Sequence, residues 1–191
     1  IEQLQDKQIP CLETTPDVFK SASATETPQG ILAILPQIPL PIPDMLDYLL
    51  IADEIRDPGN LGTLLRTAQA AGVQVVLLSP GTVDPYSPKV LRSGMGAHFN
   101  LPVITSSWEE INQITQGIRI FGSDMSQGTS LWEEDLTNPL VIIIGGEAFG
   151  LGKYARKMVD TWVHIPMEGN TESLNASAAG AILLFEVLRQ R

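Results

Sequence analysis

The chain has 191 residues, of which 43% are hydrophobic and 18% charged, so it can form one folded domain, with or without an appendage. The 12 basic and 22 acidic side chains give a net charge of −10, which opposes bulk attraction to nucleic acid but leaves room for a locally basic cleft. One cysteine and two histidines exclude a disulfide framework and argue against a metal site. No apolar run approaches the roughly 20 residues of a membrane span, and no leader sequence is evident, so we expect a cytoplasmic protein with no membrane partner.

The first 47 residues differ in composition from the rest of the chain. Residues 1–30 are polar and interrupted by prolines, and the apolar run 31–35 predicts a short strand. In residues 36–47 a proline recurs every two or three positions, a spacing that neither a helix nor a central strand tolerates, which predicts a semi-rigid linker. Residues 1–35 are too few and too polar to close a core. We therefore interpret them as the C-terminal remnant of a separate domain.

Residues 48–191 show alternating strand and helix patterns. Apolar runs of strand length occur at 48–52, 73–78, 99–103, 118–121, 140–144 and 161–165, and helix-period segments occur at 61–71, 107–116 and 173–189. Continuously apolar strands are typical of a parallel sheet that is covered on both faces. The pattern therefore predicts an α/β domain.

The first candidate site segment begins at Asp57 and enters the helix expected at 61–71. Pro58 marks a turn into a helix whose first N–H groups need a capping acceptor. Arg66 falls on a different face from the leucine stripe, with Gly62 one turn before it, where the missing side chain permits close approach of a ligand or backbone. Taken alone, the segment fits an ordinary capped helix with a solvated arginine better than a functional site.

The second segment, 145–150, follows the apolar strand 140–144 and contains three glycines. Glycines at the carboxyl end of a strand lie where open α/β sheets bind ligands. Glu147 occupies a position that excludes the G-x-G-x-x-G fingerprint, and no P-loop sequence follows, so a nucleotide-dependent oxidoreductase is a remote alternative. A tight turn with an exposed glutamate is the competing interpretation.

The third segment, 165–180, runs from the end of a strand through a polar loop into a helix. That helix is apolar around much of its circumference, which indicates a central helix or half of a subunit interface. Asn175 and Ser177 stand near its first turn, where polar groups need partners or form a site.

Together the three segments resemble the SpoU (TrmH-like) branch of the SPOUT RNA methyltransferases. The motifs of this family are an Asn-x-Gly-x-x-x-Arg-Thr-Ala helix entry, a Gly-x-Glu-x-x-Gly turn, and Ile-Pro-Met followed by Ser-Leu-Asn-x-Ser. Residues 60–68, 145–150 and 165–177 match them in this order. Each motif is weak alone, but the three in sequence are specific.

The resemblance implies a parallel-sheet SPOUT fold over residues 48–191, with a C-terminal trefoil knot that would be an exception to the rule against threaded chains. It also implies bound S-adenosylmethionine and a homodimer whose active site draws on both subunits. The positions that match the cofactor contacts of the family are Gly145, Ile165, Leu174, Pro166 and Met167.

The activity implied is methyl transfer from S-adenosylmethionine to a ribose 2′-hydroxyl of RNA. Because a guanidinium stays protonated, we expect Arg66 to stabilise the developing alkoxide rather than to act as a base. Asn60 would fix Arg66 or the ribose, and the polar wall would be completed by Glu147, Asn175 and Ser177.

Two basic residues, Lys89 and Arg92, are candidates for contacts with RNA phosphates, although ordinary surface charges would look the same. Residues 23–35 resemble the end of a ribosomal-protein-like RNA-binding domain, which favours ribosomal over transfer RNA. The alternative function is a catalytically idle RNA-binding protein of the same fold.

Overall fold

A computed structural model gives the structure of the chain. It describes residues 2–23, 25, 27–37, 39–125, 127–146, 150–169 and 173–191. The chain divides into two compact units, 1–38 and 39–191, which are described separately below.

The N-terminal unit contains two short helices, α1 (Glu2–Asp6) and α2 (Pro16–Ala22). Thr15 caps α2, since its hydroxyl accepts a hydrogen bond from the backbone N–H of Val18. The strand predicted at 31–35 is wrong: the segment has no regular structure, and Ile31 and Ile34 are 86% and 90% exposed. A strand needs a partner for its backbone hydrogen bonds, and none of the residues that the structure describes pairs with this segment.

The second unit carries the α/β pattern. Its strands are β1 (Tyr48–Asp53), β2 (Val75–Leu78), β3 (Val103–Thr105), β4 (Arg119–Ser123), β5 (Thr129–Ser130), β6 (Leu140–Gly145) and β7 (Thr161–His164). Its helices are α3 (Pro58–Ala70), α4 (Pro88–Gly94), α5 (Trp108–Ile114), α6 (Lys153–Met158) and α7 (Ala176–Gln190), with 3₁₀ turns η1 (Ala97–Phe99) and η2 (Leu131–Glu133).

The strands form one sheet in the order β3-β2-β1-β6-β4-β7-β5, and its neighbouring strands are parallel. The predicted parallel-sheet α/β class is therefore confirmed. The strand boundaries shift by one or two residues elsewhere, but by four at the run predicted at 99–103, which becomes strand only at Val103, because residues 97–101 close into a turn with Leu101 N–H bonded to Ala97 C=O. The expected threading of the chain through a trefoil knot stays a prediction.

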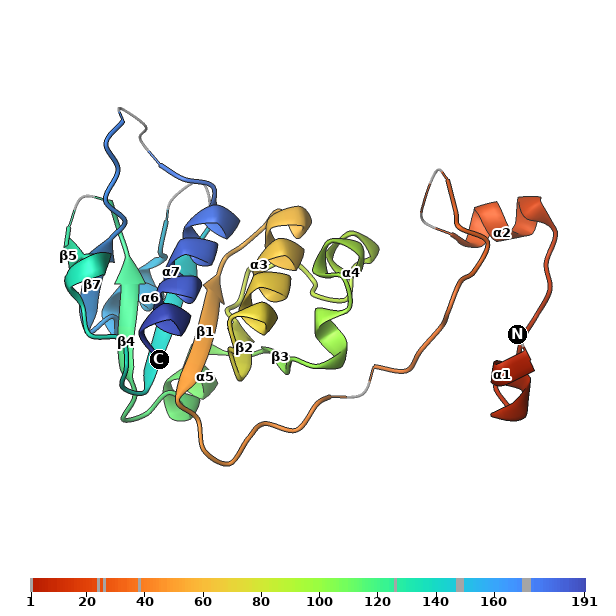
Figure 1. Cartoon of the computed structure of the whole chain (residues 1–191), viewed down its shortest axis with the longest axis horizontal. Helices are drawn as coiled ribbons and strands as arrows, with labels where there is room; N and C mark the ends of the chain where they lie inside the picture. The colour runs from red at the N-terminus through yellow and green to blue at the C-terminus, as the bar shows by residue number, and fades with distance from the viewer. Residues whose placement is uncertain are drawn as a thin grey trace. The chain divides into compact units, whose positions relative to one another are not determined.

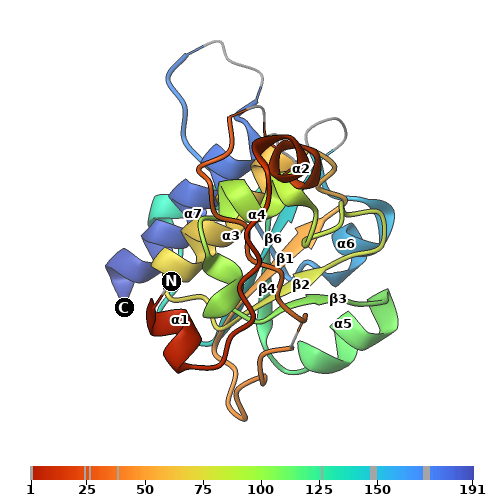
Figure 2. The same ribbon diagram turned by 90° about the vertical axis from the view of Figure 1, so that its right-hand side faces the viewer.

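Helices cover both faces of the sheet, with α3, α4 and α7 on one face and α5 and α6 on the other (Figures 1 and 2). Alternate residues of β1 explain this arrangement, since successive side chains of a strand point to opposite faces. Leu50 packs in the cluster that includes Leu64 of α3 and Leu184 of α7, whereas Leu49 packs in the cluster that includes Ile111 of α5.

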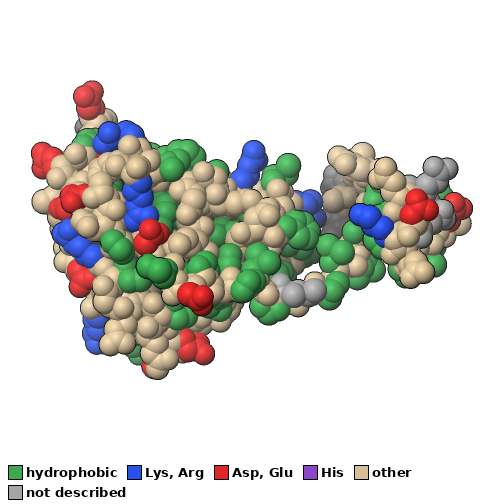
Figure 3. Space-filling view, turned by 60° about the horizontal axis from the view of Figure 1, so that its bottom comes forward, with side chains coloured by type: hydrophobic (Ala, Val, Ile, Leu, Met, Phe, Trp, Pro, Cys, Tyr) green, Lys and Arg blue, Asp and Glu red, His purple; other side chains and the backbone are tan. Residues whose placement is uncertain are grey.

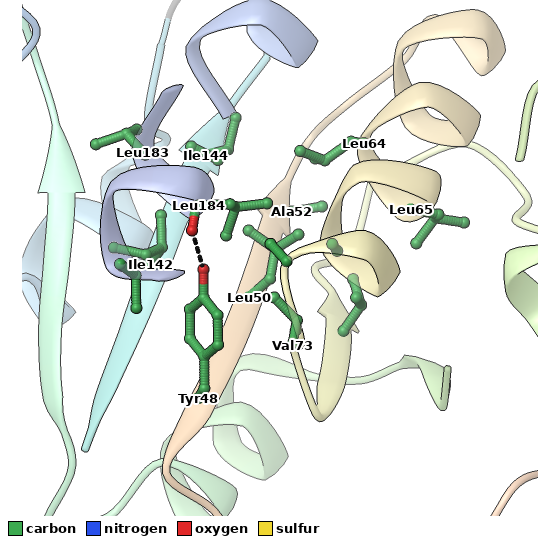
Figure 4. Close-up of a cluster of buried hydrophobic side chains, with 14 of the residues drawn as sticks. Tyr48, Leu50, Ala52, Leu64, Leu65, Val73, Ile142, Ile144, Leu183 and Leu184 are labelled. Carbon is green, nitrogen blue, oxygen red and sulfur yellow. Dashed lines mark hydrogen bonds between the residues drawn. The ribbon is translucent and has the colours of Figure 1, made fainter. Parts of the chain in front are cut away.

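Helix α7 is the most apolar of these helices and packs beside α3 over the central strands (Figures 1 and 4). Its inner face is buried through Leu183 and Leu184, and the Leu184 carbonyl accepts a 2.9 Å hydrogen bond from the Tyr48 hydroxyl. Its outer face leaves Phe185 and Leu188 46% and 44% exposed. The core therefore uses only part of the apolar circumference predicted for this helix.

Candidate active site

A pocket of about 250 Å³ opens at the carboxyl ends of the central strands. The last residues of β4 and β6, Ser123 and Gly145, lie in its wall. Open parallel sheets bind ligands at this edge, outside the carboxyl ends of their strands. The pocket is lined by Ser123, Asp124, Met125, Ile144, Gly145, Gly146, Gly150, Leu151, Arg156, Ile165, Met167, Ser173, Leu174, Ala176 and Ala179.

Four of the five predicted cofactor residues line this pocket, namely Gly145, Ile165, Met167 and Leu174. Pro166 is not among the lining residues, although both of its chain neighbours are. The structure therefore brings the second and third sequence motifs to one pocket.

The glycines of the second motif allow the chain to fold back tightly after β6. A Cβ atom on Gly145 would lie 2.3 Å from the carbonyl carbon of Gly150, far closer than real Cβ atoms approach other atoms. The backbone N–H of Gly150 bonds to the Gly146 carbonyl at 3.1 Å, and Gly150 has a φ of 63°, a left-handed conformation that favours glycine. The predicted site residue Glu147 lies outside the described residues.

The predicted polar residues of the first and third motifs form a hydrogen-bonded cluster, Asn60, Asn175 and Ser177. The Asn175 side-chain amide donates to Asn60 Oδ1 at 2.9 Å, and the Ser177 hydroxyl donates to Asn175 Oδ1 at 2.6 Å. Asn175 is also the N-cap of α7, accepting bonds from the backbone N–H groups of Ser177 and Ala178. This capping begins the helix at Ala176, slightly later than the predicted 173.

The cluster lies beside the pocket, because Asn175 stands between two pocket residues, Leu174 and Ala176. Close packing of α3 against α7 holds it there. A Cβ atom on Gly180 of α7 would lie 2.5 Å from Leu64 Cδ1 of α3, so the two helices approach closely where a side chain is missing.

Arg66 lies outside this cluster. It follows Leu64, which faces α7, by two positions, or roughly 200° around the helix axis, so it lies on the side of α3 that faces away from α7. Its side chain is exposed and forms no hydrogen bond or ion pair with any side chain that the structure describes. Within one chain, the structure therefore joins Asn60, Asn175 and Ser177 but not Arg66.

Lys89 and Arg92 are exposed on α4. Lys89 Nζ lies 3.5 Å from Asp57 Oδ2, so this lysine sits near the start of α3. Asp57 is the N-cap of α3, where its carboxylate accepts the Asn60 backbone N–H at 2.8 Å. This bond and, to a lesser extent, the charge of Lys89 lower the pKa of Asp57 and so favour its ionised form. On the surface seen in Figure 3, basic and acidic side chains are intermixed rather than separated into one basic area.

Two charged pocket residues were not predicted from the sequence. Arg156 of α6 forms an ion pair with Asp124 at 2.9 Å, donates to the Leu151 carbonyl at 3.1 Å, and lies over the Trp162 ring at 5.2 Å. Asp124 could have been predicted as a pocket residue from its position directly after β4, because residues that follow parallel strands meet at the ligand-binding edge of the sheet. Arg156 belongs to a basic cluster with Lys153 and Lys157 just after the second motif, but that cluster fits a contact with RNA and a solvated helix face equally well and does not indicate a pocket residue.

Within the described ranges, no group of three or more His, Cys, Asp or Glu side chains is arranged to hold a metal ion. A search of the same residues finds no helix with the length and apolar character needed to cross a bilayer.

Comparison with known proteins identifies a family and several relatives. The SpoU rRNA Methylase family profile matches residues 47–185. The chain is 34% identical to the 23S rRNA (guanosine(2553)-2′-O)-methyltransferase RlmP of Bacillus subtilis, over 94% of this chain and 73% of that protein. It is 32% identical to the mitochondrial rRNA methyltransferase 3 of Mus musculus, over 96% of this chain and 58% of that protein.

Solved structures share the fold. An AdoMet-bound rRNA methyltransferase from Sinorhizobium meliloti superimposes with a TM-score of 0.82 at 30% identity, covering 92% of this chain and 70% of that one. The SpoU methyltransferase AviRb from Streptomyces viridochromogenes, in complex with AdoMet, gives a TM-score of 0.71 at 32% identity, covering 78% and 62%. The chain thus spans from under two thirds to nearly three quarters of the length of these proteins.

Proposed function

The chain belongs to the SpoU rRNA methylase family, and from this premise we propose that it transfers a methyl group from S-adenosylmethionine to a ribose 2′-hydroxyl of RNA. Ribosomal RNA is favoured over transfer RNA, on the printed names of the relatives. The observation that carries the proposal is the 2.9 Å hydrogen bond between Asn60 and Asn175, which lie 115 positions apart and meet beside the pocket.

The pocket suits S-adenosylmethionine in the chemistry of its lining. Apolar side chains such as Ile165 and Leu174 offer a surface for an adenine ring, while the backbone groups around Gly145 and Gly146 offer hydrogen bonds to polar edges. The close return of the chain at Gly145 keeps side chains out of this part of the wall. When bound, the cofactor supplies an already activated methyl group on a sulfonium centre.

The residues of the chain would then orient the hydroxyl and stabilise the charge that develops on its oxygen. Asn60, Asn175 and Ser177 provide a fixed polar wall, since their mutual hydrogen bonds and the helix cap hold each side chain in place. Arg66 provides the positive charge. Glu147 is included in this proposed polar wall only because it matches the Gly-x-Glu-x-x-Gly motif of the family.

We propose that the active protein is a homodimer. Two features support this: Arg66 faces away from α7 of its own chain, and α7 exposes Phe185 and Leu188 on an apolar face. A second copy that covers this face would exclude water from the apolar side chains. Arg66 of one copy would then serve the pocket of the other.

Lys89 and Arg92 are proposed to contact RNA phosphates, because both are exposed on α4, and Lys89 lies near the start of α3, where Asn60 lies. We also propose a cytoplasmic location, supported by the bacterial relative, although another relative is named as mitochondrial.

Calorimetric titration with S-adenosylmethionine, followed by transfer of labelled methyl groups to ribosomal and transfer RNA, tests the proposal. We expect cofactor binding and labelling of ribosomal RNA in preference to transfer RNA. RNA binding without methyl transfer would support the catalytically idle alternative. Failure to bind the cofactor would contradict the assignment of the pocket.

A further inference from the structure

Asp53 is a buried carboxylate that the proposed reaction does not use. It is the last residue of the central strand β1 and is 1% exposed. Its Oδ1 accepts the Ser79 hydroxyl at 2.8 Å, and its Oδ2 accepts the backbone N–H of Gly152 at 2.7 Å. Among the side chains that the structure describes, none forms an ion pair with Asp53, and the nearby Arg56 pairs with Glu54 instead.

Burial without a cation is costly for a carboxylate. It raises the pKa of Asp53, although the bonds from Gly152 and Ser79 act in the opposite direction. Hydrogen bonds to a carboxylate hold their donors more firmly than hydrogen bonds between neutral groups. A buried carboxylate with two such bonds is therefore well suited to fix the position of its donors, Gly152 and Ser79.

The partner of Asp53 lies at the end of the turn that forms one wall of the pocket. Gly146, Gly150 and Leu151 all line the pocket, and Gly152 follows them directly. Gly152 is also the N-cap of α6, and its carbonyl accepts the backbone N–H of Arg156, another pocket residue. Moving Gly152 would therefore displace both the adjoining pocket residues Gly150 and Leu151 and the start of α6.

Glu54, the residue after β1, packs against a second pocket residue, Gly146. A Cβ atom on Gly146 would lie 2.6 Å from the Glu54 backbone carbonyl oxygen, so Gly146 rests against Glu54 with no space for a side chain. Glu54 has a φ of 50°, an uncommon conformation for this residue type. Its backbone N–H bonds to the Ser79 hydroxyl at 3.1 Å, and this bond helps to hold the conformation.

We propose that Asp53 is a positioning residue for the cofactor pocket: its carboxylate fixes Gly152, while the adjoining Glu54 backbone supports Gly146, and together they hold the neighbouring pocket residues Gly146, Gly150 and Leu151 in place. Asp53 acts through these backbone contacts and does not touch the cofactor itself. The inference rests on the proposed function, because it assumes that S-adenosylmethionine binds in this pocket.

The test compares the Kd for S-adenosylmethionine among the wild-type chain and the variants Asp53→Ala and Asp53→Asn. Loss of the charged acceptor in Asp53→Ala should raise Kd about ten- to a hundredfold. Asparagine keeps one oxygen for Gly152, and its amide can donate to Ser79, so Asp53→Asn should recover most of the affinity. In the methylation assay, Asp53→Ala should raise the KM for the cofactor more than it lowers kcat.

Asp160→Ala is the matched control. The Asp160 carboxylate also accepts one backbone N–H, that of Ile120 at 2.9 Å, but it lies before β7 and outside the pocket. We expect this variant to lose stability without a change in Kd. An unchanged Kd in Asp53→Ala, or an equal rise in Asp160→Ala, would overturn the role of Asp53 and leave the proposed function standing. A wild-type chain that fails to bind would overturn both.

Hydrogen exchange of the Gly152 amide tests the contact without any substitution. Protection of this amide, comparable to that of amides in β1, is expected if the carboxylate holds it. Exchange at the rate of an open loop would overturn the inference, whether or not Asp53→Ala folds.

Discussion

The two ends of the sheet use similar polar side chains in different ways. At the carboxyl end, Asp53 and Asn175 hold turns and helix starts that line or flank a pocket. At the amino end, Gln74 accepts the backbone N–H groups of Asp47 and Tyr48 at 2.7 and 3.1 Å, and donates to the Met45 carbonyl at 3.2 Å. Neither Gln74 nor these partners line the pocket.

Arg191 performs the same kind of task as Gln74. Its guanidinium donates to the Asp47 and Asn138 carbonyls, each at 2.9 Å, and lies over the Tyr48 ring at 5.0 Å. The amino end thus ties the last residue of the chain to the loops before β1 and β6. Substitutions in the polar network at the carboxyl end should therefore lower methylation activity, whereas substitutions in the network at the amino end should lower the free energy of unfolding.

The largest expected effect is that of Arg66→Ala. Its exposed side chain contributes little to folding, so cofactor affinity and melting temperature should hardly change, while methylation should fall on the order of 10²–10³-fold. The control is Arg119→Ala, which removes an exposed arginine at the amino end of β4. Single-turnover methylation rates decide the matter, and an unchanged rate in Arg66→Ala would remove this residue from the proposed mechanism.

Leu188→Asp should affect activity although Leu188 lies far from the pocket end of the sheet. Leu188 lies in the last turns of α7, far along the helix from Asn175, yet a homodimer would make this position matter for activity. A charge on the exposed apolar face should give monomers by light scattering and abolish most methylation, with little change in melting temperature. Trp132→Asp in η2 is the control, because that apolar side chain is similarly exposed, 51% against 44%, and belongs to none of the elements proposed to bind RNA or a second copy. A fully active monomer would refute the shared site.

Asn175→Asp separates helix capping from the polar cluster. Aspartate caps a helix as well as asparagine does, so stability should be retained, but it has no amide to donate to Asn60 Oδ1. Methylation should therefore fall about tenfold or more. Asn175→Ala should lose activity and also about 1 kcal/mol of stability. If the aspartate variant methylates RNA at the wild-type rate, the bond to Asn60 has no catalytic importance.

Gln74→Ala should affect only stability. The substitution leaves the backbone N–H of Tyr48, a residue only 2% exposed, without its acceptor, at a cost of about 1–3 kcal/mol. Denaturant unfolding should register this loss, while the Kd for S-adenosylmethionine stays constant. Gln113→Ala, at an exposed position of α5, should leave both quantities unchanged. A higher Kd in Gln74→Ala would contradict the idea that the amino end of the sheet affects stability alone.

The smallest expected effect concerns pH. Burial raises the pKa of Asp53 above its ordinary value of 3.8, so the folded chain holds this proton to higher pH than the unfolded chain. The contribution of Asp53 to the free energy of unfolding is therefore fully present below pH 3.8 and is lost as pH rises through the raised pKa. Melting temperatures measured across this window should decline less in Asp53→Asn than in the wild type. Parallel curves would contradict this.

The periodicity of the sequence predicted the sheet well, because long apolar runs such as 140–144 have few alternatives to a buried parallel strand. It failed at 31–35, where the run is apolar but has no pairing partner among the described residues. Strand formation depends on such partners, and a local pattern does not contain them.

For the site, the motifs led to the cluster of Asn60, Asn175 and Ser177 and to four residues of the pocket lining that the sequence predicted as cofactor contacts. They did not indicate Asp53 or Arg156. The roles of these two residues arise from contacts with Gly152 and Asp124, which depend on how separate loops meet at the sheet edge.

The central claim is tested most directly by incubating the chain with S-adenosylmethionine and ribosomal RNA, digesting the RNA to nucleosides, and measuring them by mass spectrometry. A ribose-methylated nucleoside should form with the wild-type chain and be nearly absent with Arg66→Ala. Methylation on a base, or no methylated nucleoside despite cofactor binding, would contradict the account.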